Sequence, residues 1–114
     1  MNPDKANITV TQILELLVKG QYDKVIDLDV GSYLTVADLC IAIHEYGRHL
    51  TMPPIVDIEQ MSIVRVEGSK PKRWHVALDL WTIEEGRSDL TLELTLINSP
   101  GSYYLVELDN IHVL

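Results

Sequence analysis

The 114-residue sequence contains no phenylalanine and a single cysteine, and it has few cations for its number of acids. Nine lysines and arginines stand against seventeen aspartates and glutamates, which gives a formal charge of −8 with histidine neutral. A strongly acidic domain is repelled by nucleic acid and by anionic membranes, so we expect neither as a partner. The lone Cys40 cannot form an internal disulfide, which is typical of a reducing compartment.

Long apolar runs and targeting signals are also missing. No stretch approaches the roughly 20 apolar residues that cross a bilayer. The N-terminal sequence MNPDKANITV has no apolar core of the kind found in signal peptides, so we expect a cytoplasmic protein. The sequence also has no zinc-type spacing, glycine-rich phosphate loop or nucleophile motif, and it therefore predicts no cofactor, no metal site and no catalytic residue.

The composition and length fit one domain over residues 1–114, since the hydrophobic fraction of 46% is enough for a buried core. The pattern predicts a helical half at about 8–50 and a sheet half at about 56–114. Apolar residues at helical spacing indicate an amphipathic helix over 8–19. The segment 21–34 fits either a short helix or a strand.

A second helix has clearer boundaries. Thr35 is a favoured N-cap, and Gly47 is a favoured residue just past a helix end. Cys40 lies on the apolar stripe between them, and we expect it in the core. Pro53 and Pro54 then interrupt the chain, because neither donates a backbone hydrogen bond, and they mark the passage to the sheet.

Four antiparallel strands are predicted in the second half, joined by short polar turns. Connections this short place each strand beside the next one. The sequence therefore predicts an α+β fold in which N-terminal helices pack on one face of a four-stranded antiparallel meander. The strands are expected near residues 58–67, 74–83, 88–97 and 103–113.

Alternation of leucines in the third of these strands determines the expected register. Every second residue from 90 to 96 is a leucine, which marks the core face. Directly opposed residues share a face, so apolar positions are paired with apolar positions. The expected pairs are Leu80 with Leu90, Leu78 with Leu92, Val76 with Leu94, Leu96 with Tyr104, Leu94 with Val106, Leu92 with Leu108, Val64 with Leu78, Val66 with Val76, and Trp81 with Asp89.

The same register predicts what the opposite face of the sheet carries. Glu93 and Glu107 are directly opposed, which is unfavourable by up to about 1 kcal/mol, and Arg65 reaches over Ala77 toward Glu93. We interpret this face as an ordinary solvated surface or as a binding surface. A third interpretation is metal or general acid–base chemistry at the paired carboxylates, although no ligand spacing supports a metal site. The candidate binding residues are Arg65, His75, Asp79, Trp81, Arg87, Asp89, Glu93, Glu107 and Asp109.

The hairpin around Gly86 and the last histidine allow plainer interpretations. Arg87 and Asp89 either pair across the hairpin or form one wall of a recognition site together with Trp81. His112 is expected to make only an edge or helix contact near the C-terminus.

Several segments of the chain resemble a known family. They are DLWT (79–82), EEGRSDLTL (84–92) and VELDNIHVL (106–114), with LTVADL (34–39) in the helical half. With these segments the chain resembles a family of small bacterial domains of unknown function. The resemblance implies no established activity and no catalytic residues. The order of helices and meander also resembles cystatin-like folds, including the nuclear-transport-factor-like group with its cone-shaped pocket.

Three functional hypotheses remain open. The first is a non-enzymatic binding module that uses its acidic sheet face to hold a basic protein. An immunity-type inhibitor of a basic toxin is one concrete version of it. The second is a small-ligand-binding or catalytic domain with a pocket between sheet and helices. The third is a structural homodimer that packs its exposed sheet faces around Trp81. The charge pattern favours the first.

Overall fold

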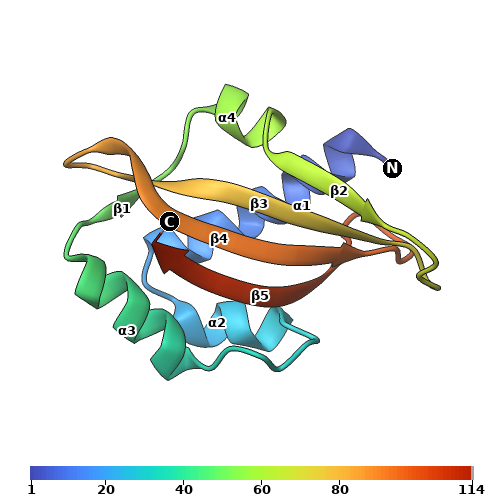
Figure 1. The fold of residues 1–114 in the computed structure, drawn as a ribbon, viewed down its shortest axis with the longest axis horizontal. Helices are drawn as coiled ribbons and strands as arrows, with labels where there is room; N and C mark the ends of the chain where they lie inside the picture. The colour runs from blue at the N-terminus through green and yellow to red at the C-terminus, as the bar shows by residue number, and fades with distance from the viewer. Residues whose placement is uncertain (114) are drawn as a thin grey trace.

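Helices precede and then flank an antiparallel sheet in the computed structural model, which describes residues 1–113. Leu114, the last residue of the C-terminal motif, lies outside them. The described residues form four helices and five strands (Figure 1), which confirms the predicted α+β class. The elements are α1 (Pro3–Val18), α2 (Tyr22–Leu28), α3 (Val36–Tyr46), β1 (Leu50–Thr51), α4 (Ile55–Glu59), β2 (Ser62–Val66), β3 (Arg73–Thr82), β4 (Gly86–Ile97) and β5 (Leu105–Val113).

Helix α1 begins at Pro3, five residues before the predicted start. Asn2 caps it by accepting a hydrogen bond from the Lys5 amide at 3.1 Å, and proline suits the first helical position. The Thr9 hydroxyl donates to the Lys5 carbonyl and accepts from the Tyr104 amide, so α1 is tied to the segment before β5. Its buried side consists of Ala6, Thr9, Val10, Ile13, Leu14 and Leu17.

The ambiguous segment 21–34 contains both kinds of structure. Helix α2 occupies its first part, and Asp29 then forms a parallel bridge with Val106 at the outer edge of β5. The Val30 amide donates to the Val106 carbonyl, and the Leu108 amide donates to Asp29 Oδ1, each at 2.9 Å. These contacts cover part of an edge that would otherwise expose backbone groups.

Helix α3 has the boundaries that local chemistry predicts. Thr35 and Asp38 form a reciprocal capping box, and Gly47 ends the helix in the left-handed conformation at φ 74°. The prediction for Cys40 is wrong, because this side chain is exposed. The helix buries a narrower stripe than the sequence pattern indicates, made of Leu39 and Ile43.

The start of the sheet half differs from the prediction. The expected strand over 58–67 is shorter, because its first residues belong to α4, which follows Pro54 directly. A short strand, β1, precedes it and was not predicted. Both β1 and β2 pair with the same edge of β3, so within the described residues the sheet order is β1 or β2, then β3, β4 and β5.

The predicted register between β3 and β4 is confirmed at Val76–Leu94 and Leu78–Leu92. It fails beyond Asp79, where β4 contains a bulge, and Trp81 lies opposite Arg87 rather than Asp89. At this bulge the buried Ser88 hydroxyl donates to the Leu80 carbonyl at 2.7 Å, and the predicted pair Leu80–Leu90 is absent from the register.

The other two predicted registers are wrong. Strand β5 is shifted along β4 by two residues or more from its predicted register. Leu94 therefore lies opposite Leu108, and Leu96 lies opposite Val106. Strand β2 is shifted by three, which turns Val64 and Val66 away from the core face. They lie opposite His75 and Arg73 instead of core residues, and Val64 is 60% exposed.

The layers follow from these pairings. Figure 1 shows α1 behind the sheet, α2 and α3 beside the β5 edge, and α4 at the opposite edge. The core lies between α1 and the sheet and contains the leucines of β4 together with every second residue of β3 from Trp74. The front of the sheet is left without a covering helix. No helix within residues 1–113 has the length and hydropathy needed to span a membrane.

Candidate functional site

We define the open face as the side of the sheet opposite α1. Alternate residues of β3 lie on it, because the buried and half-buried positions of that strand alternate without interruption. The pairings extend the open face across β4 and β5. Its polar members include Arg73, His75, Asp79, Thr91, Glu93, Thr95, Glu107, Asp109, Asn110 and His112.

Two histidines and two carboxylates form a connected cluster at the centre of the open face. His112 Nε2 lies 2.6 Å from Glu93 Oε2, and His75 Nε2 lies 3.1 Å from Glu93 Oε1. His75 Nδ1 lies 3.3 Å from Asp109 Oδ2, which also accepts from the Thr95 hydroxyl at 2.7 Å. We call His75, Glu93, Asp109 and His112 the histidine–carboxylate cluster.

The pKa values of the two carboxyl groups in this cluster are shifted in opposite directions. The hydrogen bond from His112 is the main reason why the pKa of Glu93 is lowered, whereas burial raises the pKa of Asp109. A neutral imidazole has only one N–H, so His75 can donate to Glu93 and Asp109 together only when it is protonated.

Glu93 and Glu107 are not opposed, which corrects the prediction. Glu93 lies opposite Asn110, and Glu107 lies opposite Thr95 because β5 is shifted. Glu107 forms an ion pair with Arg73 at 2.9 Å. The predicted repulsion is replaced by attraction to a residue that the sequence reading did not select.

A second polar group lies where α4 meets the sheet. Asp57 Oδ2 accepts hydrogen bonds from Trp81 Nε1 at 3.1 Å and from Arg87 at 2.8 Å. The hydrogen bond to Asp57 is the main cause of a raised Arg87 pKa. Asp79 Oδ1 lies beside them and accepts from the Thr91 hydroxyl at 3.3 Å.

A cleft of about 420 Å³ opens at this place, between α4 and β3. We call it the α4 cleft. Its size falls within the range of small-ligand pockets, about 300–1,000 Å³. The residues of its wall that bear on function are Pro53, Asp57, Ser62, Asp79, Arg87 and Thr91.

Two candidate residues lie outside both groups. Arg65 is opposite Trp74, on the helix side of the sheet, so it does not approach Glu93 as the register predicted. Asp89 is exposed in the β4 bulge, where its amide donates to the Tyr46 hydroxyl at 3.2 Å. The Arg65 side chain therefore does not contribute to the open face.

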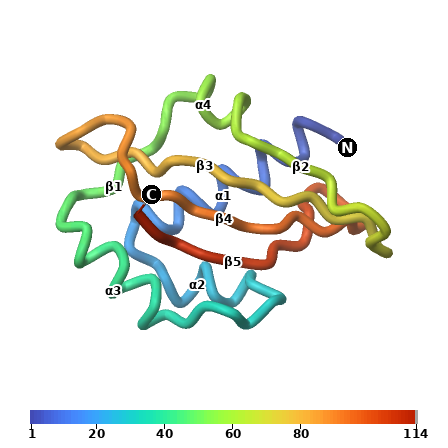
Figure 2. The backbone as a smooth tube through the Cα atoms, viewed as in Figure 1, coloured from blue at the N-terminus to red at the C-terminus, as the bar shows by residue number. Residues whose placement is uncertain are grey.

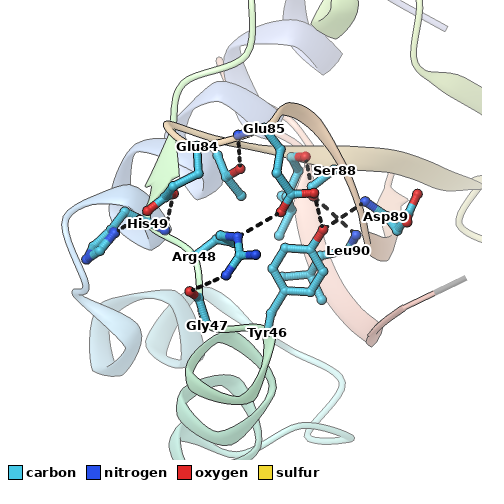
Figure 3. Close-up of polar contacts among 11 residues, drawn as sticks. Tyr46, Gly47, Arg48, His49, Glu84, Glu85, Ser88, Asp89 and Leu90 are labelled. Carbon is cyan, nitrogen blue, oxygen red and sulfur yellow. Dashed lines mark hydrogen bonds and ion pairs between the residues drawn. The ribbon is translucent and has the colours of Figure 1, made fainter.

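The β3–β4 hairpin is held against the end of α3, as Figure 3 shows. Glu84 accepts hydrogen bonds from the His49 amide at 2.9 Å and contacts its Nδ1 at 2.6 Å. These contacts lower the pKa of Glu84 to about 2, with the side-chain hydrogen bond as the main cause. Glu85 accepts from the Tyr46 hydroxyl at 3.0 Å and pairs with Arg48. Both glutamates thus have structural partners.

Comparison with known proteins identifies the family. Residues 14–114 match the family model described as "Domain of unknown function (DUF7668)", and this range includes the whole open face and the α4 cleft. The chain belongs to this family. No curated protein and no solved structure matches it.

Three polar residues of this DUF7668 domain were missed or undervalued from sequence. Asp57 stands three residues after Pro54, and a proline followed by an acidic residue is typical of a helix start. This pattern is the sequence signal that could have indicated α4 and its aspartate. Arg73 is in phase with His75 and could have been found by extending the strand. His112 reaches Glu93 only because of the shifted register, and no local signal indicates that contact.

The open face offers hydrogen bonding, ion pairing and proton exchange. Among residues 1–113, no group of three or more histidine, cysteine or acidic side chains is arranged to hold a metal ion. The carboxylates are instead hydrogen-bonded to histidine, arginine, tryptophan and hydroxyl donors.

Proposed function

We propose that this domain is a non-enzymatic binding module whose open face holds a basic segment of a partner protein. One observation carries the proposal. The open face and the adjoining α4 cleft contain five carboxylates and two arginines, an excess of three negative charges while the histidines are neutral. The residues are Asp57, Asp79, Glu93, Glu107 and Asp109, with Arg73 and Arg87.

The charges lie together on one side of the sheet, and this placement favours recognition of a specific partner over a generally acidic surface. Helix α1 lies behind the sheet and no helix covers the front, so the excess charge lies on one side of the sheet (Figure 1). Exposed apolar side chains stand at both borders, Val64 on β2 at 60% and Leu105 on β5 at 47% exposed. A charged centre with apolar neighbours is common in protein interfaces, and the charge of −8 would accelerate encounter with a basic partner. An immunity-type inhibitor of a basic toxin is one form that this function could take.

The structure changes the support for the two alternative hypotheses. The homodimer hypothesis placed Trp81 at an exposed centre, but this side chain is half-buried and hydrogen-bonded to Asp57 of α4. The small-ligand hypothesis expected a pocket between sheet and helices, and a cavity of about 510 Å³ lies between α1 and the start of β5, lined by Thr9, Ile13 and Leu105 among others. The α4 cleft opens on the other side of the sheet, and a small ligand would be tested at both places.

The experiment compares two charge variants that differ only in location. Asp79→Asn/Glu107→Gln removes two charges from the open face, and Glu15→Gln/Glu45→Gln removes two from exposed positions on α1 and α3. Each protein is immobilised and used to capture partners from the native host at rising salt, with identification by mass spectrometry. We expect a protein of basic isoelectric point to be retained by wild type and the helix variant and lost from the open-face variant. Equal retention by both variants would refute the proposal.

A further inference from the structure

One edge of β3 is interrupted. Strand β1 pairs with its end at Trp81 and Thr82, and β2 pairs with its beginning, from Arg73 to Ala77. Between these stretches, over residues 78–80, neither strand provides a partner. Figure 2 shows why: the chain leaves β1, passes through α4 and returns to the same edge as β2. The α4 cleft lies at this gap.

The backbone of Asp79 faces the gap. In an antiparallel ladder, successive residues direct their N–H and C=O groups to opposite edges. The Ile83 amide donates to the His49 carbonyl on the β1 side, and the Leu80 carbonyl accepts from Ser88 on the β4 side. Asp79 shares its direction with Ile83, so its N–H and C=O point into the gap. None of the described residues that border the gap forms a hydrogen bond with these groups.

The carboxylates beside the gap also keep acceptor capacity. Trp81 and Arg87 both donate to Oδ2 of Asp57, and Thr91 donates to Oδ1 of Asp79. The other oxygen of each carboxylate accepts no hydrogen bond within residues 1–113. Two carboxylates and one guanidinium leave one negative charge at the gap, which a single cationic group would neutralise.

We propose that the gap binds one lysine or arginine residue of an extended partner segment. Its backbone amide and carbonyl would pair with Asp79 and fill the interrupted edge, as in recognition by strand addition. Residues opposed across a sheet share a face, so its cationic side chain would lie on the open face beside the Asp79 carboxylate and within reach of Asp57. This proposal rests on the proposed function and specifies which part of the basic partner enters which site.

The test is an NMR titration of the isotope-labelled full chain with short probes. One probe is a capped pentapeptide with arginine between two pairs of serines, and its matched control carries the neutral isostere citrulline. Methylguanidinium alone tests whether the cation suffices without a peptide backbone. We expect the arginine peptide to shift the amide resonances of residues 78–80, while citrulline peptide and methylguanidinium bind at least several-fold more weakly.

Affinities of single variants then show which side chains contribute to peptide binding. We expect Asp79→Asn and Asp57→Asn each to weaken binding of the arginine peptide about two- to fivefold, the range for a partly exposed ion pair, while Glu15→Gln on α1 leaves it unchanged. Equal affinity for arginine and citrulline, or for methylguanidinium and peptide, would overturn the proposal. An equal loss in Glu107→Gln would also overturn it, because binding would then follow the charge of the whole open face. In that case the proposed function would survive, since it requires the open face and not the gap.

Discussion

The substitution Glu93→Gln separates the observed register from the one predicted by alternation. If Glu93 were opposed to Glu107, removing its charge would be neutral or stabilising. In the structure Glu93 is held by His112 at 2.6 Å and by His75 at 3.1 Å, so its charge is attracted from two sides. We therefore expect the substitution to destabilise the fold.

The magnitude follows from exposure. Glu93 is 28% exposed, and its partners His112 and His75 are 32% and 38% exposed, so solvent screens both pairs. Pairs of this kind contribute about 0.2–1 kcal/mol each, and we expect a loss of about 1 kcal/mol for the two together. In a domain of this size, that loss lowers the melting temperature by about 4 °C.

The pH dependence has a defined sign. Glu93 has a pKa lowered from its ordinary value of 4.5, chiefly by the His112 hydrogen bond. Its contribution to stability is present above the unfolded-state pKa and is lost as the pH falls through the lower folded-state pKa. The difference between wild type and Glu93→Gln should therefore be fully present at pH 6 and should shrink as the pH falls through and below about 4.5.

Urea denaturation followed by circular dichroism, repeated across this pH range, measures the effect. Glu15→Gln on the exposed side of α1 is the matched control and should change the free energy of unfolding little at any pH. The urea slope should stay constant if the effect is on stability alone. An unchanged or raised stability of Glu93→Gln at pH 6 would refute the pairing with the two histidines.

Three further predictions concern single positions. A Cβ at Gly31 would lie 2.2 Å from Glu107 Cγ, so Gly31→Ala should displace that side chain and cost about 1 kcal/mol in a thermal melt; an unchanged melt would contradict this contact. The His49 side chain is the main reason why the pKa of Glu84 is lowered to about 2, so in His49→Ala the Glu84 carboxyl, followed by NMR, should titrate at a clearly higher pH, though still below its ordinary 4.5 because the backbone amide of residue 49 continues to donate to it. A persisting low value would assign the shift to another group. Gly86 has φ 76°, so Gly86→Ala should destabilise the fold by about 1 kcal/mol in urea denaturation. Equal urea midpoints for wild type and variant would contradict the need for glycine at this turn.

Much of the local structure could be predicted from the sequence. The capping box joins Thr35 to Asp38, and the left-handed Gly47 directly follows the last residue of α3. Each of these two signals involves residues within one helical turn, so each is visible in a short stretch of sequence. The leucines of β4 show which face is buried for the same reason. The sequence pattern does not predict the short helix α4, because Pro54 is interpreted there as an interruption of regular structure. Proline is also favoured at helix starts, and α4 begins directly after Pro54.

The candidate site could be predicted only in part. His75, Asp79, Glu93, Glu107 and Asp109 lie on the open face, as alternation indicates. Their partners could not be identified in this way, because a shift of two residues between strands leaves a side chain on its own face. A bulge in β5 between Leu108 and Asn110 then brings His112 onto the open face, which alternation along β5 does not predict. A shift of three does change the face, and the position of Arg65 was therefore wrong.

The sequence by itself determined the fold class, the boundaries of α3 and the face on which most of the acids lie. These properties depend on the spacing of residues close together in the chain. Only the tertiary structure decided that Glu93 meets two histidines and that Asp57 meets Trp81 and Arg87. Those contacts depend on a bulge, on strand shifts and on the path of the chain through α4, which arise when distant segments pack together.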